Sequence, residues 1–524
     1  TSFGTFNNRS VVQFNPSGGT TYTTGTTSMA SLRITPTGSG ASLVMNGSTN
    51  LGTNALMLDG PFDFAITGGG ELTAANSTSK YLHVNNPNTT LSIGLVLNAQ
   101  NGTAPSVVFA GPGFVELTST TSQNTLTGTN RFVIAGGTVR ANDTQVGFTS
   151  AGHGVLSLTG GVLEIKNGSN GTGASADFTR AVGSLAGNVT WGAGTANEIG
   201  SGGISAFGSA ASVNLGGNAT PTLLQWNSTD FVGTGYALKF GSTQSNAVLT
   251  FLNPIQIEQG TGYQLREIQV IGGAGGDRSI LAGRISGSSG ADLLKTGTGT
   301  LELSAANTYT GNTWVAGGNL FISGSLGQTV LPTGTVTVQN GGTLSGTGTI
   351  NGTSLVVNSG GTLAPGGLTA PGTFTVSGDV TLRSGSAFST RIQGAAAGSG
   401  YDQLLVTAGN VSLNGSYSAL FSSFTPSGNE RLFVINNTST SGTLTGMFSN
   451  YADGAVVANY GGFDWKIFYG ASANSFGGTN GNDVVLAPFA PVPEPTHILG
   501  VCALAAAAVG LAVRRFHHRL ATPA

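Results

Sequence analysis

The sequence has few charged residues. They make up 8% of its 524 residues, about a third of the share in ordinary soluble domains. With a formal net charge of −2 and no basic stripe, the chain lacks the electrostatic footprint of a nucleic-acid-binding protein. The low charge does not come with a disordered composition, because 39% of the residues are hydrophobic. We therefore expect a folded chain without a nucleic-acid partner.

Cysteine and histidine are also scarce. The single cysteine, Cys502, lies in an apolar run near the C-terminal end, so the rest of the chain can form no disulfide and must be held by packing and backbone hydrogen bonds. With five histidines, two of them at His517 and His518, histidine-based catalysis is poorly supplied. The chain begins at Thr1 without an apolar leader, which predicts a secretory signal that has been removed.

The C-terminal end combines three features in a fixed order. Prolines flank an acidic residue in a linker at 488–495, an apolar run follows, and basic residues come last. The run predicts a transmembrane helix over 496–513, near the lower length limit for a bilayer span. A basic cytoplasmic tail over 514–524 orients it, so everything before the linker should lie on the far side of the membrane.

These features closely resemble the PEP-CTERM sorting signal of bacteria. The family pattern is a Pro-Glu-Pro motif, a membrane helix and an arginine-rich cytoplasmic end. The resemblance implies recognition and processing by exosortase, a membrane-embedded cysteine protease, followed by release to the cell surface or the extracellular space. It assigns the sorting signal to Val492, Pro493, Glu494, Pro495, Arg514 and Arg515. A plain tail anchor is the alternative.

A repeat occupies much of the remaining chain. Residues 295–304 read KTGTGTLELS, followed by NTYTG at 307–311 and GGNL at 317–320. A looser copy reads GPGFVELT at 111–118, NTLTG at 124–128 and GGTV at 136–139. Gly-Gly-x-aliphatic steps recur at separations of 24 (160 − 136), 24 (341 − 317) and 19 (360 − 341) residues. Such periods indicate stacked structural units.

Each unit contains short segments with alternating apolar residues. Leu301 and Leu303 flank Glu302, which puts the two leucines on one face of a strand and the glutamate on the other. Glycine pairs and Asn-Gly steps predict the corners between strands. The Asn-Gly steps begin at Asn101, Asn167, Asn340 and Asn351. A coil of about 20 residues cannot bury its apolar face alone and must stack on its neighbours.

This pattern predicts an all-β fold, a right-handed parallel β-helix (solenoid) over 1–394. The segment 292–322 resembles the autotransporter-associated β-strand repeat, whose family carries such repeats in exported passenger domains. After a break at 394–400, a C-terminal β region at 401–487 is predicted to cap the stack. Its aromatic residues are interpreted as core. They are Tyr417, Phe421, Phe424, Phe433, Trp465, Phe468 and Tyr469.

The same architecture hosts polysaccharide-degrading enzymes, so catalysis has to be weighed. Gly152-His153-Gly154 matches the Gly-His-Gly of polygalacturonases, but glycoside hydrolysis needs two placed carboxylates. The paired aspartates of that family are missing, since no Asp-Asp step occurs. His153 also falls in the repeat's own Gly-x-Gly corner, which indicates a turn residue.

Acidic residues elsewhere are sparse. Asp177 with Arg180, Asp230, and Asp277 with Arg278 are interpreted as surface positions or local pairs. The segment 477–486 resembles one calcium-roll nonapeptide, a site that needs tandem copies, so a final turn and strand is expected there. We predict no catalytic, cofactor-binding or metal-ligating residues and no enzyme activity.

Together these features predict an exported, membrane-anchored and then cell-surface or extracellular-matrix protein. Its role would be structural or adhesin-like, with exopolysaccharide or other surface components as partners. Rows of threonine, serine and asparagine would offer hydrogen bonds to sugars. Two alternatives remain open: a polysaccharide-degrading β-helix enzyme, lyase or hydrolase, and an inert anchored spacer.

Overall fold

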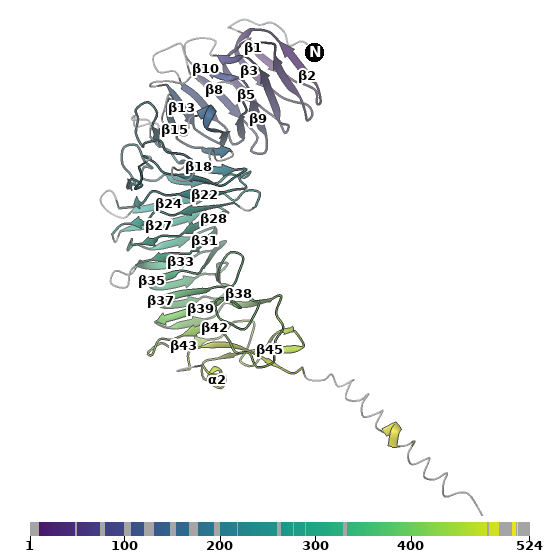
Figure 1. The fold of residues 1–524 in the computed structure, drawn as a ribbon, viewed down its shortest axis with the longest axis vertical. Helices are drawn as coiled ribbons and strands as arrows, with labels where there is room; N and C mark the ends of the chain where they lie inside the picture. Colours follow the sequence, from purple (N-terminus) through teal and green to yellow (C-terminus); the bar gives the residue numbers. More distant parts are fainter. Residues whose placement is uncertain are drawn as a thin grey trace, which may run out of the picture.

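The structure is a computed structural model that describes most of the chain (Figure 1). The described residues are 10–47, 50–73, 79–98, 106–119, 130–146, 154–166, 177–192, 200–216, 218–258, 264–275, 277–288, 290–327, 333–478, 481–491, 506–509 and 511.

One long parallel sheet, called sheet A, runs along the molecule from end to end (Figure 1). Its strands pair in chain order, each contributed by the next coil. They are β2 (Thr21–Thr24), β4 (Ser42–Met45), β6 (Phe64–Gly68), β9 (Thr90–Ile93), β12 (Phe114–Leu117), β14 (Thr138–Ala141), β16 (Val162–Lys166), β18 (Gly202–Phe207), β21 (Ala237–Phe240), β24 (Gln264–Val270), β27 (Ala291–Thr296), β30 (Thr313–Val315), β33 (Thr333–Val338), β35 (Thr349–Val357), β37 (Thr373–Leu382), β39 (Gln403–Ala408) and β42 (Leu432–Asn437).

In the N-terminal half a second parallel sheet, sheet B, lies opposite sheet A. Its strands are β1 (Val11–Phe14), β3 (Thr27–Ile34), β5 (Leu51–Leu58), β8 (Lys80–Val84), β11 (Ser106–Ala110), β13 (Arg131–Ile134), β15 (Val155–Leu158) and β17 (Val189–Thr190), with β7 (Glu71–Thr73) and β10 (Val96–Asn98) beside them. The short helix α1 (Asp143–Val146) follows β14.

In the C-terminal half two further parallel sheets replace sheet B. Sheet C contains β19 (Ala211–Val213), β22 (Val248–Phe251), β25 (Arg278–Leu281), β28 (Thr300–Leu303), β31 (Gly318–Ile322), β34 (Gly342–Gly346), β36 (Thr362–Pro365), β38 (Ala387–Ile392) and β41 (Ser416–Phe421). Sheet D contains β20 (Leu224–Gln225), β23 (Ile255–Gln256) and β26 (Ile285–Ser286). The short strands β29 (Ala306–Asn307) and β32 (Ser325–Leu326) continue that side and lead to β35.

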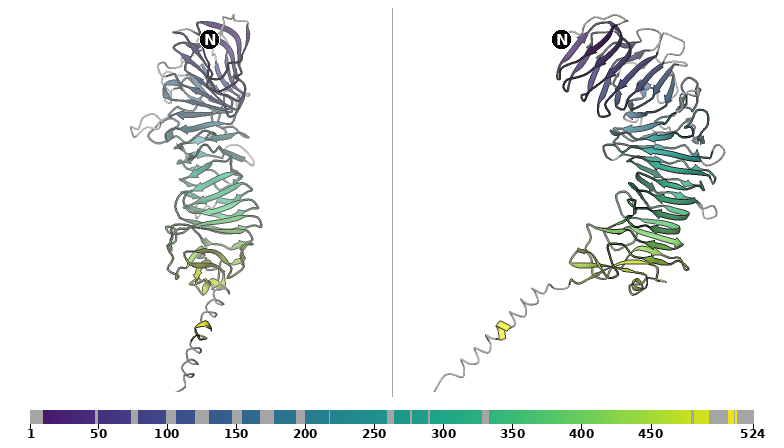
Figure 2. Two further views of the ribbon diagram at one scale, coloured as in Figure 1. Left: turned by 90° about the vertical axis from the view of Figure 1, so that its right-hand side faces the viewer. Right: turned by 180° about the vertical axis from the view of Figure 1, so that it is seen from behind.

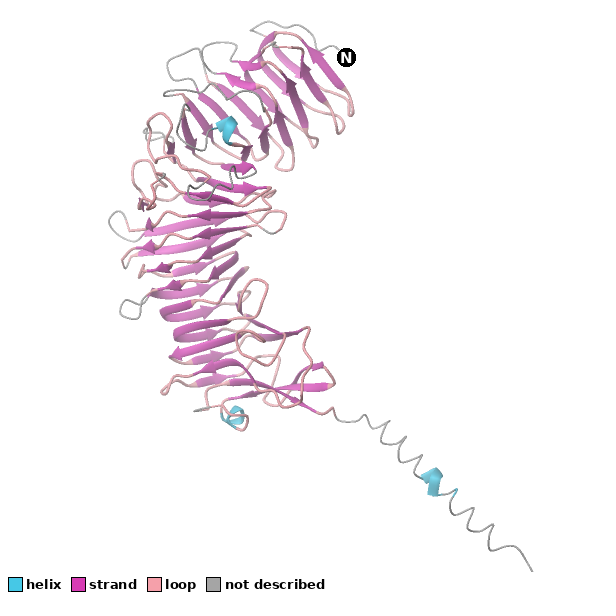
Figure 3. Cartoon of the chain, in the orientation of Figure 1, coloured by secondary structure: helices cyan, strands magenta, loops and turns pink. Residues whose placement is uncertain are grey.

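The result is an elongated, curved stack of coils, in which the strands lie across the long axis (Figures 1 and 2). Strands far outweigh helices (Figure 3). The predicted all-β, β-helix-like solenoid is therefore confirmed, and its handedness stays a prediction.

The coil spacing follows the glycine spacing of the sequence. Strand registers advance by 24 (162 − 138), 24 (342 − 318) and 19 (362 − 343) residues, through the pairs Thr138 with Val162, Gly318 with Gly342 and Thr343 with Thr362. Identical positions of successive coils thus lie one above another. The apolar residues form a continuous interior column, of which Leu301, Leu320, Leu344 and Leu363 are consecutive members. Glu302 points away from that interior, as predicted, and pairs with Arg278.

The corners need glycine at particular places. Gly297, at the start of the Gly-x-Gly step, has φ +76°, and a Cβ there would lie 2.2 Å from the carbonyl oxygen of Val270. Gly341 also has a positive φ, of 80°, so the corner predicted at Asn340-Gly341 is confirmed. The corner predicted at Asn351 is wrong, because Asn351 and Gly352 lie inside β35 at an irregularity in its register. The steps at Asn101 and Asn167 lie outside the described residues.

Parallel pairing continues past residue 401. Strand β37 pairs with both β39 and β40 (Val411–Leu413), and β40 pairs with β43 (Leu444–Gly446). The last strands are antiparallel: β44 (Val456–Tyr460), β45 (Phe463–Tyr469) and β46 (Val484–Phe489), with α2 (Ala471–Asn474) between the last two. The predicted domain boundaries stay predictions.

Aromatic rings fill the end of the core. Phe388 and Phe448 stack with their ring centroids 5.6 Å apart, and Tyr417 stacks on Phe448 at 5.0 Å. Tyr417, Trp465 and Tyr469 are buried, as predicted for core residues, whereas Phe421, Phe424, Phe433 and Phe468 are partly exposed.

The membrane anchor is predicted from sequence in the C-terminal segment. Within the described part of the chain, no helix has both the length and the apolar character needed to cross a membrane. Of the helix predicted at 496–513, residues 506–509 and 511 are described, and they are helical. The sorting signal at 492–495 and 514–515 lies outside the described residues.

Candidate functional site

The polar residues of the repeat hold neighbouring coils together. Lys295 is fully buried, and its Nζ donates to the carbonyl oxygens of Gly297 at 2.9 Å, Gly299 at 2.7 Å and Gly317 at 2.8 Å. Burial lowers the pKa of Lys295 to about 7. Through these hydrogen bonds the side-chain nitrogen connects the Gly-x-Gly corner of one coil to the Gly-Gly corner of the next.

Asn307 has a similar role on another side of the coil. Its Oδ1 accepts a hydrogen bond from the backbone N–H of Ile285 at 2.9 Å, and its Nδ2 donates to the carbonyl oxygens of Ala305 at 2.9 Å and Ser325 at 3.0 Å. One buried amide thus connects three successive coils, which satisfies backbone groups that a buried corner would otherwise leave without partners.

Buried charges in the structure are paired or bonded to backbone. Glu164 is bonded to Arg140 at 2.6 Å and accepts from Ser242 at 2.5 Å. Arg140 also lies over the ring of Phe207, with its guanidinium carbon 3.4 Å from the ring centroid. These contacts connect β14 and β16 of sheet A to the loop at 242–246.

The interpretation of Arg180 as a surface residue is wrong. The side chain is buried, and its guanidinium donates to the carbonyl oxygens of Val146, Gly154 and Asn188. Sequence could not reveal this because the carbonyls of Val146 and Gly154 lie 34 and 26 residues before Arg180 in the chain. Asp177 instead accepts a hydrogen bond from the backbone N–H of Ser212 at 2.8 Å, and Asp277 accepts one from the hydroxyl of Ser245 at 2.9 Å, across 35 and 32 residues of sequence. Asp230 is bonded to Thr190 at 3.3 Å. Among the residues that the structure describes, no group of three or more His, Cys, Asp and Glu could hold a metal ion. His153 lies outside them.

One extended feature of the described residues is the outward side of sheet A between β27 and β43, called the sheet A face. Its middle column is built from residues that pair in register on successive coils. They are Leu294, Trp314, Thr337, Val356, Thr381, Ser412 and Thr445. The residues that alternate with them, such as Val315, Val336 and Leu355, point into the core. Since strands stack about 4.8 Å apart, the column repeats at that step.

A hydrogen-bonded polar column runs beside it. Asp292 accepts from the backbone N–H of Asn312 at 2.7 Å, and the Oδ1 of Asn312 accepts from the N–H of Thr335 at 2.9 Å. Thr335 and Ser354 share a hydrogen bond between hydroxyls at 3.1 Å. Farther along, Asp379, Asn410 and Thr443 are bonded in the same manner. The column is thus fixed before any ligand arrives.

Trp314 is the one aromatic member of the middle column. Its ring is partly exposed, and its indole N–H donates to the Oδ2 of Asp292 at 3.2 Å. Leu294 and Thr337 are its register neighbours. Sequence analysis missed Trp314 as a surface residue, although its place between the buried Thr313 and Val315 is the alternation that could have identified it.

A groove of about 260 Å³ lies on the outward side of sheet C. Arg391 and Asp402 form a two-pronged ion pair at 2.8 and 3.0 Å there, and Arg391 also donates to the carbonyl oxygens of Gly367 and Ala370. Because the guanidinium is occupied by these partners, this groove has little capacity left to bind an anion.

Comparison with known proteins supports the nature of the repeat. Residues 293–320 match the family model of the passenger-associated transport repeat, so the passenger-like repeat predicted for this segment is confirmed. No curated protein matches the chain. A repeat of this family indicates an exported protein associated with the cell surface.

Proposed function

We propose that this exported protein is a non-enzymatic surface component that binds neutral exopolysaccharide through the sheet A face. The observation that supports this most directly is the in-register middle column from Leu294 to Thr445. Except at Thr337, which is buried to 6% exposure, each member of the column is at least partly exposed. The column therefore offers apolar and hydroxyl side chains at a regular step, which suits a polymer of repeated sugar units. When one polysaccharide chain makes several weak contacts, each contact raises the effective concentration for the next, so the overall affinity is higher than that of any single contact.

The chemistry of the face favours an uncharged sugar polymer. Hydroxyls and amides of Thr381, Ser412 and Asn410 can donate to and accept from sugar hydroxyls. The ring of Trp314 offers an apolar surface to the C–H side of a pyranose. Thr381 on β37 lies between two exposed charges of opposite sign, Asp379 on the same strand and Arg383 directly after its end. The local charge is therefore balanced, and neither an anionic nor a cationic polymer gains much from it.

We further propose that the C-terminal segment is a PEP-CTERM sorting signal, with a transmembrane helix at 496–513 that anchors the chain until exosortase processes it. The support is the order of features at 492–515 in the sequence. The mass of the mature C-terminus, measured on protein from membrane and extracellular fractions of the native host, tests this. An end close to Pro495 in released protein is expected, whereas an intact Ala524 found in the membrane alone would mean a plain anchor.

Polymer binding is tested by sedimentation of the purified full-length chain with insoluble neutral polysaccharides. The variant Thr381→Glu places a charged, longer side chain in the middle column, and we expect it to reduce the bound fraction at least fivefold. Thr362→Glu is the matched control, because Thr362 also points outward from mid-sheet but belongs to sheet C. Wild-type protein that sediments with no polysaccharide and binds no cells would leave the spacer interpretation.

The runner-up function is polysaccharide degradation. It would require two or three carboxylates gathered at one cleft. The buried carboxylates of Glu164, Asp292 and Asp402 are each held by hydrogen bonds within the fold. Release of reducing ends from any bound polysaccharide would overturn the non-enzymatic proposal.

A further inference from the structure

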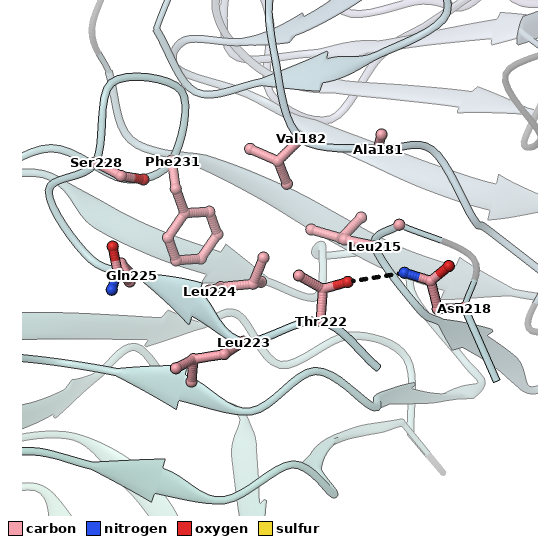
Figure 4. Close-up of a pocket in the computed structure, with 11 residues that line it drawn as sticks. Ala181, Val182, Leu215, Asn218, Thr222, Leu223, Leu224, Gln225, Ser228 and Phe231 are labelled. Atoms are coloured by element: carbon pink, nitrogen blue, oxygen red, sulfur yellow. Dashed lines mark hydrogen bonds between the residues drawn. The ribbon is translucent and has the colours of Figure 1, made fainter. Parts of the chain in front are cut away.

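A pocket of about 400 Å³ lies where the two halves of the solenoid meet (Figure 4). Sheet B ends at β17, and sheets C and D begin at β19 and β20. The chain between them departs from the regular coil and leaves a recess. The described residues that line it are 181 and 182, then 215, 216, 218 and 222–225, and finally 228 and 231.

The floor of the pocket is apolar and rigid. Leu215, Leu224 and Phe231 are buried to 5% exposure or less, and Figure 4 shows their side chains with Val182 around one space. The ring of Phe231 packs edge-on against Trp191 at 5.0 Å and Trp226 at 6.1 Å, measured between ring centroids. These contacts fix the orientation of the Phe231 ring.

Apart from the exposed Leu223, the rim is polar, and it carries no charge. Asn218, Thr222, Gln225 and Ser228 supply amides and hydroxyls (Figure 4). Asn218 and Thr222 are bonded to each other at 3.2 Å. Among the described residues that line the pocket, none has an ionisable side chain.

We propose that this pocket binds a neutral mono- or disaccharide unit, and this inference rests on the proposed function by making the pocket a second contact for the same class of polymer. A pyranose has an apolar C–H side that suits Phe231 and Leu224, and hydroxyls around its edge that suit the rim. The volume is at the small end of ligand pockets, which span about 300–1,000 Å³, so it suits one or two sugar rings better than a long oligosaccharide.

Other ligand classes fit less well. An anion such as a uronate or a sugar phosphate would be moved from water into a pocket without a counter-charge, which is costly. A purely aliphatic ligand would cover the amides and hydroxyls of the rim without giving them hydrogen-bond partners. A neutral sugar satisfies both parts of the pocket.

Titration calorimetry with the full-length chain tests the proposal. The probes are D-glucose, D-galactose, D-mannose, N-acetyl-D-glucosamine and their common disaccharides, with D-glucuronate as the anionic and cyclohexane as the aliphatic counter-probe. We expect at least one neutral sugar to bind at least tenfold more tightly than either counter-probe. Absence of binding by every neutral sugar, or equal binding of a counter-probe, overturns the proposal.

The variant Leu223→Trp narrows the mouth of the pocket, because Leu223 lines it and is 46% exposed. We expect it to weaken the sugar at least tenfold. Leu368→Trp is the matched control, since Leu368 is 40% exposed and lies on the sheet C groove instead. Gln225→Ala, an exposed rim change, should weaken binding at least threefold with an unchanged thermal midpoint. Unchanged affinity in both pocket variants would place the sugar elsewhere.

The two proposals fail separately. Thr381→Glu should reduce polymer sedimentation and leave the calorimetric affinity for small sugars unchanged. If small sugars bind and polymers do not sediment, the sheet A proposal is wrong and the pocket stands. If polymers sediment and no small sugar binds, the pocket proposal is wrong and the sheet A face stands.

Discussion

The Nζ of Lys295 donates a hydrogen bond of 2.8 Å to the carbonyl oxygen of Gly317 on the next coil. The same chemistry occurs in other coils, where Lys239 donates to the carbonyl oxygen of Gly160 at 2.7 Å and Lys80 to that of Leu72 at 2.8 Å. A parallel solenoid leaves carbonyl groups at its corners outside the regular sheet ladders. A buried lysine reaches several of them from one position, so a side chain that is normally exposed becomes part of the interior.

Replacing this lysine should destabilise the stack. Lys295→Met keeps a side chain of roughly similar length but removes its hydrogen-bond donors. The corner carbonyl groups then lose the hydrogen bonds that Lys295 donates. We expect a loss of about 1–3 kcal/mol in the free energy of unfolding, measured by urea denaturation. Lys166→Met is the control, because Lys166 is partly exposed and pairs with Glu116, an arrangement that contributes about 1 kcal/mol or less. Equal losses of unfolding free energy in the two variants would show that Lys295 does not stabilise the contact between coils.

The same lysine predicts a pH dependence. Burial lowers the pKa of Lys295 to about 7, whereas an unfolded lysine titrates near 10.4. Between about pH 7 and pH 10 the unfolded chain binds more protons than the folded chain, so stability should rise with pH in that window. Below about pH 7 both states are charged and this contribution is constant.

Other buried groups also shape the dependence of stability on pH. Burial also lowers the pKa of Lys80 to about 7, which adds to the rise. Burial raises the pKa of Tyr309, so above about pH 10 the unfolded chain loses a proton that the folded chain keeps, and stability should fall. Urea denaturation at several pH values checks both limbs, and Lys295→Met should show a shallower rise. A wild-type stability that falls steadily from pH 7 to pH 10 would rule this account out.

Asn307 should be sensitive to truncation. Asn307→Ala removes one acceptor and two donors that connect three coils, and we expect a loss of about 2–4 kcal/mol. Asn319→Ala serves as the control, since Asn319 is partly exposed and accepts one hydrogen bond from Ser345. Its loss should stay below about 1 kcal/mol. Thermal denaturation of both variants measures the difference. A smaller loss of stability for Asn307→Ala than for Asn319→Ala would refute the role of Asn307 in connecting coils.

Alanine substitutions at two glycines can distinguish the cost of backbone strain from the cost of steric overlap. Gly366 and Gly275 have similar φ values of +102° and +107°, but a Cβ at Gly366 would lie 1.9 Å from Oδ1 of Asp402, whereas Gly275 has nothing within 4 Å. Gly275→Ala should therefore cost about 1–2 kcal/mol from strain alone. Gly366→Ala should cost at least about 2 kcal/mol more, because it displaces the Arg391–Asp402 pair. Equal unfolding free energies for the two variants would show that the chain near Gly366 relaxes freely.

Much of the fold was predictable because each coil repeats the same local requirements. The alternation around Glu302, the positive-φ glycines and the separations of the Gly-Gly steps all reappear as in-register strands. The corner predicted at Asn351 failed because an Asn-Gly step also fits a strand irregularity, and β35 pairs with neighbours along both parts of its length. The buried state of Arg180 and the recess lined by Phe231 depend on segments that are distant in sequence.

The sequence alone determined the period, the side of each strand that faces the interior and the order of features at the C-terminal end, because these depend on spacing within one coil or one segment. Only the tertiary structure decided which polar residues form columns on the sheet A face, which lysines lie inside, and where a pocket opens. Those properties arise from stacking one coil on another, since register between coils brings together residues that no local pattern connects.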